Sequence, residues 1–158
     1  MLTAFINTEY WRNSMNIASI VNTESQWASL ALRLPAGIIF TAHGAQKLFA
    51  WFGGYGLEGT GQFMASQGLE PGFIMALLAG SAEFFGGIAL LLGLLVRPTA
   101  AVLAFTMLIA GVVVHGSAGL FLSNGGFEFA LALLSITAAL VVLGGGKYSL
   151  DQVIAAKR

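Results

Sequence analysis

Four long apolar runs follow one another along the chain, after a more polar first stretch. They lie at residues 27–52, 72–96, 98–118 and 126–143, and each is near the ~20 residues that a helix needs to cross a bilayer core of ~30 Å. Because that layer offers the backbone no water, segments of this length cross it only as helices. The pattern predicts an all-α fold, an integral membrane four-helix bundle.

The composition supports a lipid environment. Of 158 residues, 57% are hydrophobic and only 9% are charged, whereas soluble domains carry about 25% charged residues. The excess apolar surface must face lipid, so the bilayer is the first expected partner. The formal net charge is zero, which argues against nucleic acid as a partner. Cysteine is absent, so this chain by itself has no disulfide, thiol redox chemistry or thiolate metal site.

Basic residues are distributed unevenly between the segments that join the runs. The loops at 53–71 and 119–125 hold no lysine or arginine. The segments before the first run, between the second and third runs, and after the fourth run together hold five. Because positively charged loops stay in the cytoplasm, both termini are predicted to be cytoplasmic. The five residues are Arg12, Arg97, Lys147, Lys157 and Arg158.

These boundaries divide the chain into three parts. Residues 1–26 form a polar extension, for which an interfacial helix and a partly ordered tail are equal alternatives. Residues 27–146 form the membrane domain, whose loop at 53–71 is expected to fold over the outer mouth as a lid, and 147–158 form a cytoplasmic tail. The loop contains G-x-G-x-x-G at 54–59, but that nucleotide fingerprint requires a strand before it. A sharp turn is the better interpretation here.

Ionisable residues interrupt the apolar runs and indicate function. A charged group near the bilayer centre costs ~2.5–3.5 kcal/mol, so its presence is a functional hypothesis by default. In the first run, His43 and Lys47 share one helical face with Arg33, because the steps between them follow the spacing of three and four. Glu83, His115 and Glu128 stand in the later runs, each on a face with small residues, where membrane helices approach one another.

The predicted depths bring most of these groups together. At a rise of ~1.5 Å per residue, all except Arg33 fall in the outer half of the bilayer, and Arg33 falls in the cytoplasmic third. We expect a polar pocket that opens outward and is floored by His43 and Glu83. No metal site is expected, because the Glu-x-x-His pairs of di-iron bundles are missing.

Each of these residues also has a structural interpretation. Lys47 can extend to the interface, and Arg33 can bind backbone carbonyls near Pro35. Glu128 can be a solvated residue in the first turn of its helix, and His115 can be merely interfacial. Glu83 can form a structural ion pair with Lys47 or His43, and His43 can be a satisfied residue of the bundle core.

Several motifs in order resemble the DoxX family of small four-helix bacterial membrane proteins, over residues 27–154. Arg33 stands in LALRLPAG, His43 and Lys47 in HGAQKLF, Glu83 in AEFFGGIALLLGLL, and His115 in VVVHG. Three longer stretches also match: GGYGLEGTGQFMASQGL before Pro71, GLFLSNGGFEFA with Glu128, and GGGKYSLDQVI near the end.

The resemblance implies redox chemistry at the bacterial inner (plasma) membrane. Members are linked to a thiosulfate:quinone oxidoreductase, to a membrane complex with superoxide dismutase, and to catechol or quinone resistance. Since this chain has no cysteine, we expect a subunit that interacts with a quinone or quinol, menaquinone or ubiquinone, as its non-covalent cofactor. The expected catalytic residues are His43, Lys47, Glu83, His115 and Glu128, and the expected cofactor-binding residues are Arg33, His43, Lys47 and Glu83.

Two other functions fit the same residues. Intramembrane ionisable groups also mark transport paths, so a permease or channel for a small solute is one alternative. A non-catalytic scaffold that holds a soluble oxidoreductase at the membrane is the other. The sequence leaves open whether the chain is catalytic by itself and whether it forms a homo-oligomer.

Overall fold

The computed structural model describes residues 25–157, which form helices joined by turns and loops, with no strand in this range. The predicted all-α class is confirmed. The predicted extension at 1–26 lies almost entirely outside the described residues. The long helices are α3 (Ser25–Phe49), α5 (Gly72–Leu92), α6 (Val96–Ile109) and α7 (Glu128–Leu143), and the short ones are α4 (Gly56–Ser66) and α8 (Leu150–Ala155).

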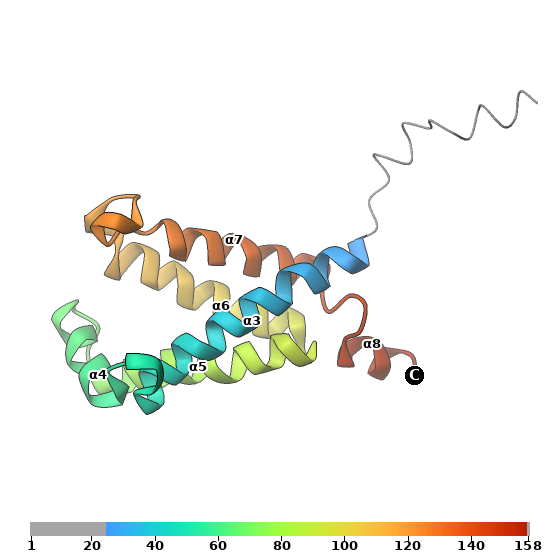
Figure 1. Ribbon diagram of the computed structural model, residues 1–158, viewed down its shortest axis with the longest axis horizontal. Coiled ribbons are helices and arrows are strands. Elements are labelled where there is room, and N and C mark those ends of the chain that lie inside the picture. The colour runs from blue at the N-terminus through green and yellow to red at the C-terminus, as the bar shows by residue number, and fades with distance from the viewer. Residues whose placement is uncertain (1–24, 158) are drawn as a thin grey trace, which may run out of the picture.

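The four long helices lie side by side in a bundle (Figure 1). α3 packs against α5 and α7, and α6 packs against the same two helices, so each long helix has two long neighbours. The core between them is apolar and buried, with Phe40 from α3, Leu90 from α5, Leu103 from α6, and Leu133 and Leu140 from α7. α4 covers the end where α3 leads into α5, and α8 lies at the opposite end.

The helix boundaries follow the apolar runs to within a few residues, with one exception. α5 ends where Gly93 adopts a left-handed conformation (φ 67°), a common C-terminal cap. The third run was predicted to stay helical to Ala118, but α6 widens into a π-helical turn at Ala110–Val114 and stops before His115. His115 therefore lies in the connection between α6 and α7.

Two of the helical segments in the described part are both long and apolar enough to cross a membrane, Gly72–Leu92 and Val96–Val114. α7 is also apolar, but it is shorter. α3 has the length, but its basic residues lower its hydropathy. The outward faces of these helices carry large exposed apolar side chains, far more than a water-soluble monomer of this size exposes. They include Ile38, Phe85, Val102, Phe105 and Val142.

Glycines bring the backbones of α3 and α5 close together. A Cβ atom added to Gly44 would lie 2.3 Å from the backbone nitrogen of Phe84, and one on Gly87 would lie 2.5 Å from that of Thr41. A Cβ on Gly37 would meet the carbonyl oxygen of Gly87 at 2.9 Å. Small residues permit this separation in membrane bundles, where dispersion contacts drive association. The α3–α5 interface is thus the most closely packed of the bundle.

Replacing Gly44 with alanine should loosen this interface. The added methyl group overlaps backbone atoms of α5 that cannot move independently, so we expect a loss of about 1–3 kcal/mol in unfolding free energy, as for other overpacked sites. Reversible unfolding in mixed micelles measures it. Gly111→Ala is the matched control, because its Cβ would meet nothing closer than 3.6 Å. Equal effects of the two substitutions would contradict the close packing of α3 on α5.

Candidate functional site

Lys47 and Glu83 form an ion pair between α3 and α5. The Nζ atom of Lys47 lies 2.5 Å from Oε2 of Glu83. The carboxylate side chain is 4% exposed and the lysine side chain 24% exposed. A buried carboxylate without a partner is strongly destabilising, so the ammonium group compensates it. The pair is possible because Gly80 and Gly87, one turn either side of Glu83, let α3 approach.

His43 lies one turn before Lys47 on the same face of α3. Its ring is half-buried and packs against Phe129 of α7, with the ring centroids 5.7 Å apart. The predicted stripe on α3 is confirmed in its direction, since Arg33, Ala36 and Phe40 on the same face are buried. His43 and Lys47 therefore line one face of α3, directed towards α7 and α5 respectively.

Aromatic rings gather beside the ion pair. Phe84, next to Glu83, meets Phe49 of α3 edge-on at a centroid distance of 5.2 Å, and Phe85 meets Phe84 at 5.3 Å. Edge-to-face pairs of this kind are favourable beyond the area that they bury. Phe49 also contacts Trp51, at 5.1 Å. The Lys47–Glu83 pair thus lies at an aromatic edge of the bundle, where Phe49 and Phe85 remain exposed.

His115 and Glu128 stabilise the α6–α7 connection instead of joining this site. The Nδ1–H group of His115 donates to the carbonyl of Gly125 (2.8 Å), and Oε1 of Glu128 accepts from the backbone amide of Leu122 (2.6 Å). The predicted placement of Glu128 on a packed face is wrong. The exposed Ala132 and Ser135 share its side, and α7 packs through Ala130, Leu133, Thr137 and Leu140.

Arg33 occupies a site of its own at the other end of α3. The guanidinium group has five N–H donors, and each donates to a backbone carbonyl. The prediction that Arg33 binds a cofactor does not fit this arrangement, because no donor remains. The interpretation of Arg33 as bound to backbone carbonyls is right in the kind of acceptor, but the prediction that these lie near Pro35 is wrong, because all five belong to other segments. They are the carbonyls of Leu90, Leu91, Gly145, Lys147 and Tyr148.

The segment after α7 completes this arginine site with polar residues that were not among the predicted site residues. Asp151 accepts from the backbone amides of Leu95 (2.7 Å) and Val96 (2.9 Å), which caps the start of α6. Ser149 caps α8 by accepting from the amide of Gln152. The S-x-x-Q spacing at 149–152 is a known helix-start signal, so this cap was detectable in the sequence.

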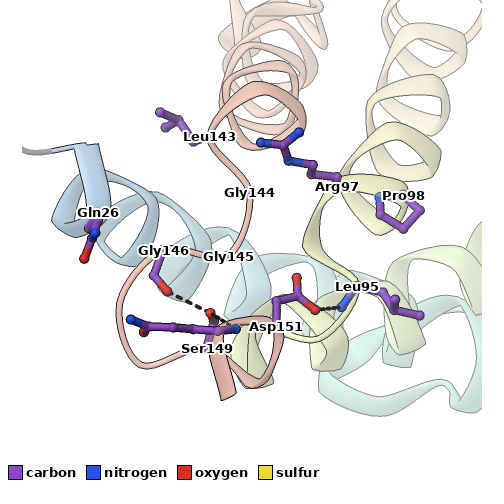
Figure 2. A pocket seen from close by; sticks show the side chains of 11 residues that line it. Gln26, Leu95, Arg97, Pro98, Leu143, Gly144, Gly145, Gly146, Ser149 and Asp151 are labelled. Carbon is purple, nitrogen blue, oxygen red and sulfur yellow. Dashed lines mark hydrogen bonds between the residues drawn. The ribbon is translucent and has the colours of Figure 1, made fainter. Parts of the chain in front are cut away.

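The cavities do not coincide with the predicted pocket. The larger, of about 490 Å³, lies at the Arg33 end between the starts of α3 and α6 and the segment after α7 (Figure 2). A smaller one of about 200 Å³ lies beside α4. His43, Lys47, Glu83, His115 and Glu128 line neither of these two cavities. The expected pocket floored by His43 and Glu83 is neither of these two cavities, and α3 and α5 pack closely beside it.

Replacing Arg33 with lysine should destabilise the fold although the charge is kept. Lysine has three donors in place of five, so buried carbonyls lose their partners, and we expect a loss of about 3 kcal/mol or more in unfolding free energy. Arg97→Lys is the control, because Arg97 is exposed and its one hydrogen bond within the described residues is to the carbonyl of Val142. A stability equal to that of the native protein would show that the carbonyl cluster contributes little.

Comparison with known proteins gives consistent matches. The DoxX family model matches residues 28–116. The chain is 37% identical over 120 residues to "Putative oxidoreductase CatD" of Bacillus subtilis (strain 168), covering 76% of this chain and 83% of that protein. It is 31% identical over 131 residues to "Inner membrane protein YqjF" of Escherichia coli (strain K12), covering 79% and 90%. No solved structure matches significantly.

Proposed function

This chain belongs to the DoxX family. We propose that it is a multi-pass inner-membrane protein whose Lys47–Glu83 pair binds a quinone or quinol and takes part in its protonation. The name of YqjF supports the membrane, and the name of CatD supports oxidoreductase chemistry. The single observation that carries the proposal is a buried carboxylate paired with a partly exposed ammonium group at an aromatic edge.

In this proposal all four long helices cross the bilayer and both termini are cytoplasmic. The arrangement supports it, because the start of α6 and the segments on either side of α8 lie at one end of the bundle (Figure 1), and they hold Arg97, Lys147 and Lys157. Trp27 and Tyr148 lie at that end, where interfacial aromatic residues are expected, and their ring centroids are 5.8 Å apart. The basic residues of α3 do not prevent insertion, since carbonyls satisfy Arg33 and Glu83 neutralises Lys47.

Single cysteines test the orientation, because the native chain has none to interfere. In intact cells, a membrane-impermeant maleimide should label Ser66→Cys and Ser123→Cys, which lie in exposed positions of the two outer segments. Lys157→Cys should react only after the membrane is permeabilised. If Lys157→Cys were labelled in intact cells while the other two cysteines were protected, the termini would face outward, and the proposed topology would be wrong.

The ion pair has the groups that a quinone headgroup requires. An ammonium group has three N–H donors, and Lys47 uses one of them on Glu83, so donors remain for a carbonyl oxygen. A bound quinone accepts two electrons and two protons. Lys47 would hold and polarise its carbonyl oxygen, and Glu83, with His43 one turn away from Lys47, would carry protons. The exposed rings of Phe49 and Phe85 would bring the headgroup from the lipid to this edge.

The electrons come from another molecule in this proposal. The side chains of Lys47, Glu83 and His43 can bind a quinone and transfer protons, but they do not carry electrons. A soluble oxidoreductase at the membrane surface is the proposed electron donor. A homo-oligomer of the chain is the second proposed assembly, and it supplies no electrons. The proposed catalytic set is narrower than the sequence predicted, because His115 and Glu128 are engaged in the α6–α7 connection.

Titration of purified protein in nanodiscs with a short-tailed menaquinone or ubiquinone analogue tests the site. We expect saturable binding, weakened about tenfold or more by Glu83→Gln or Lys47→Met, since each removes a charge-assisted hydrogen bond. Glu58→Gln on the exposed face of α4 is the matched control. Each single variant leaves one charge without its partner and could unfold for that reason. The double variant Lys47→Met with Glu83→Gln leaves no unpaired charge, so a loss of quinone binding in it reports on the site and not on unfolding. Native protein without saturable binding contradicts the proposal.

The same variants distinguish the two alternative functions. Flux of a small solute into proteoliposomes that disappears in Glu83→Gln would favour a permease. Loss of a co-purifying oxidoreductase on changes confined to exposed loops, with Lys47 and Glu83 intact, would favour a scaffold.

A further inference from the structure

The larger cavity lies at the opposite end of the bundle from the Lys47–Glu83 pair. Its apolar lining is Leu95, Pro98 and Leu143, from the start of α6 and the end of α7. Its polar lining includes Arg97, which lies between Leu143 and Pro98, together with Gln26 and the backbone of the glycine run at 144–146 (Figure 2). A volume of about 490 Å³ is large enough for a small polar headgroup and the first carbons of a chain.

Two of the polar side chains that line this cavity, those of Asp151 and Ser149, are already engaged by hydrogen bonds. Both carboxylate oxygens of Asp151 accept backbone amides of α6, and Ser149 donates to the carbonyl of Gly146 while accepting from Gln152. Arg97 has five N–H donors, and the described residues give it one hydrogen bond, to the carbonyl of Val142 at 3.2 Å. Among the described residues Arg97 is the cation that lines the cavity, and its guanidinium group, which lies over Gly144, has most of its N–H donors without a partner there.

The surroundings carry excess positive charge at the height of lipid headgroups. Arg33, Arg97, Lys147 and Lys157 stand at this end, and Asp151 is the acidic residue among the described residues there. The carbonyls around Arg33 satisfy its donors but leave its charge in place. Trp27 stacks under the ammonium group of Lys147 at 4.6 Å, as side chains do at a membrane interface.

We propose that this cavity binds the phosphate headgroup of an anionic phospholipid. Arg97 donates to the phosphate oxygens, because a guanidinium fork matches phosphate geometry. Leu95, Pro98 and Leu143 contact the adjoining glycerol and acyl carbons, so the lipid tail continues along the outside of the bundle. The site is independent of the proposed quinone chemistry, and it lies at headgroup level in either orientation of the protein.

Lipid retention measured by native mass spectrometry tests the site. The full chain is purified in a mild detergent and exposed to equimolar phosphatidylglycerol and phosphatidylcholine, and in a separate arm to inorganic phosphate. We expect one retained phosphatidylglycerol, favoured over phosphatidylcholine. Arg97→Gln should weaken its retention about tenfold, the effect of one lost charge-assisted contact. Lys157→Gln removes a cation at the same end but outside the cavity, and it should retain the lipid as the native chain does.

Three results would overturn the proposal. Equal retention by the native chain and Arg97→Gln would mean that Arg97 does not hold the headgroup. Equal retention of the two lipids would mean that the negative charge is not recognised. Binding of inorganic phosphate that displaces phosphatidylglycerol at millimolar concentration would assign the cavity to a free anion instead of a lipid. A circular dichroism spectrum of Arg97→Gln that matches the native one shows that the variant is folded, so a change in lipid retention reports on the cavity.

Discussion

The structure depends on one constraint, that no charge can remain uncompensated inside a bundle that faces lipid. The chain meets it in two different ways. The guanidinium of Arg33 is saturated by neutral carbonyls, so it joins three segments and has no further capacity to bind. The carboxylate of Glu83 is compensated by one ammonium group that is itself partly exposed. Only the second arrangement leaves donors for another molecule, which is why the candidate chemistry belongs to Lys47 and Glu83.

The ion pair in turn depends on how closely α3 and α5 approach. Gly37 and Gly44 on α3, and Gly80 and Gly87 on α5, remove the side chains that would hold the helices apart. The carboxylate of Glu83 can then meet Lys47 without leaving the α5 face that packs on α3. The ion pair therefore requires the glycines, since larger residues at these positions would separate the two charges and leave the carboxylate of Glu83 buried without a partner.

The two ends of the bundle have different chemistry. At one end, aromatic rings lie beside a charge pair, and two connections, α4 and the segment between α6 and α7, close the bundle. At the other, the segment after α7 folds back onto Arg33 and the start of α6, and a cavity that Arg97 lines remains. The proposed quinone site and the proposed lipid site therefore lie at opposite ends of the bundle and use different cations, Lys47 and Arg97.

The sequence by itself determined the helical class, the positions of the long helices and the buried stripe of α3, because these follow from local apolar runs and from 3.6-residue periodicity. It also limited the partners of Glu83 to Lys47 or His43. Only the tertiary structure decided the rest. The acceptors of Arg33 are backbone carbonyls, which no sequence pattern encodes, and α7 is apolar on every side, so its packed face could not be read from the small residues after Glu128. The place of His115 depended on a π-helical turn in α6, which shortens that helix and moves the histidine into the connection.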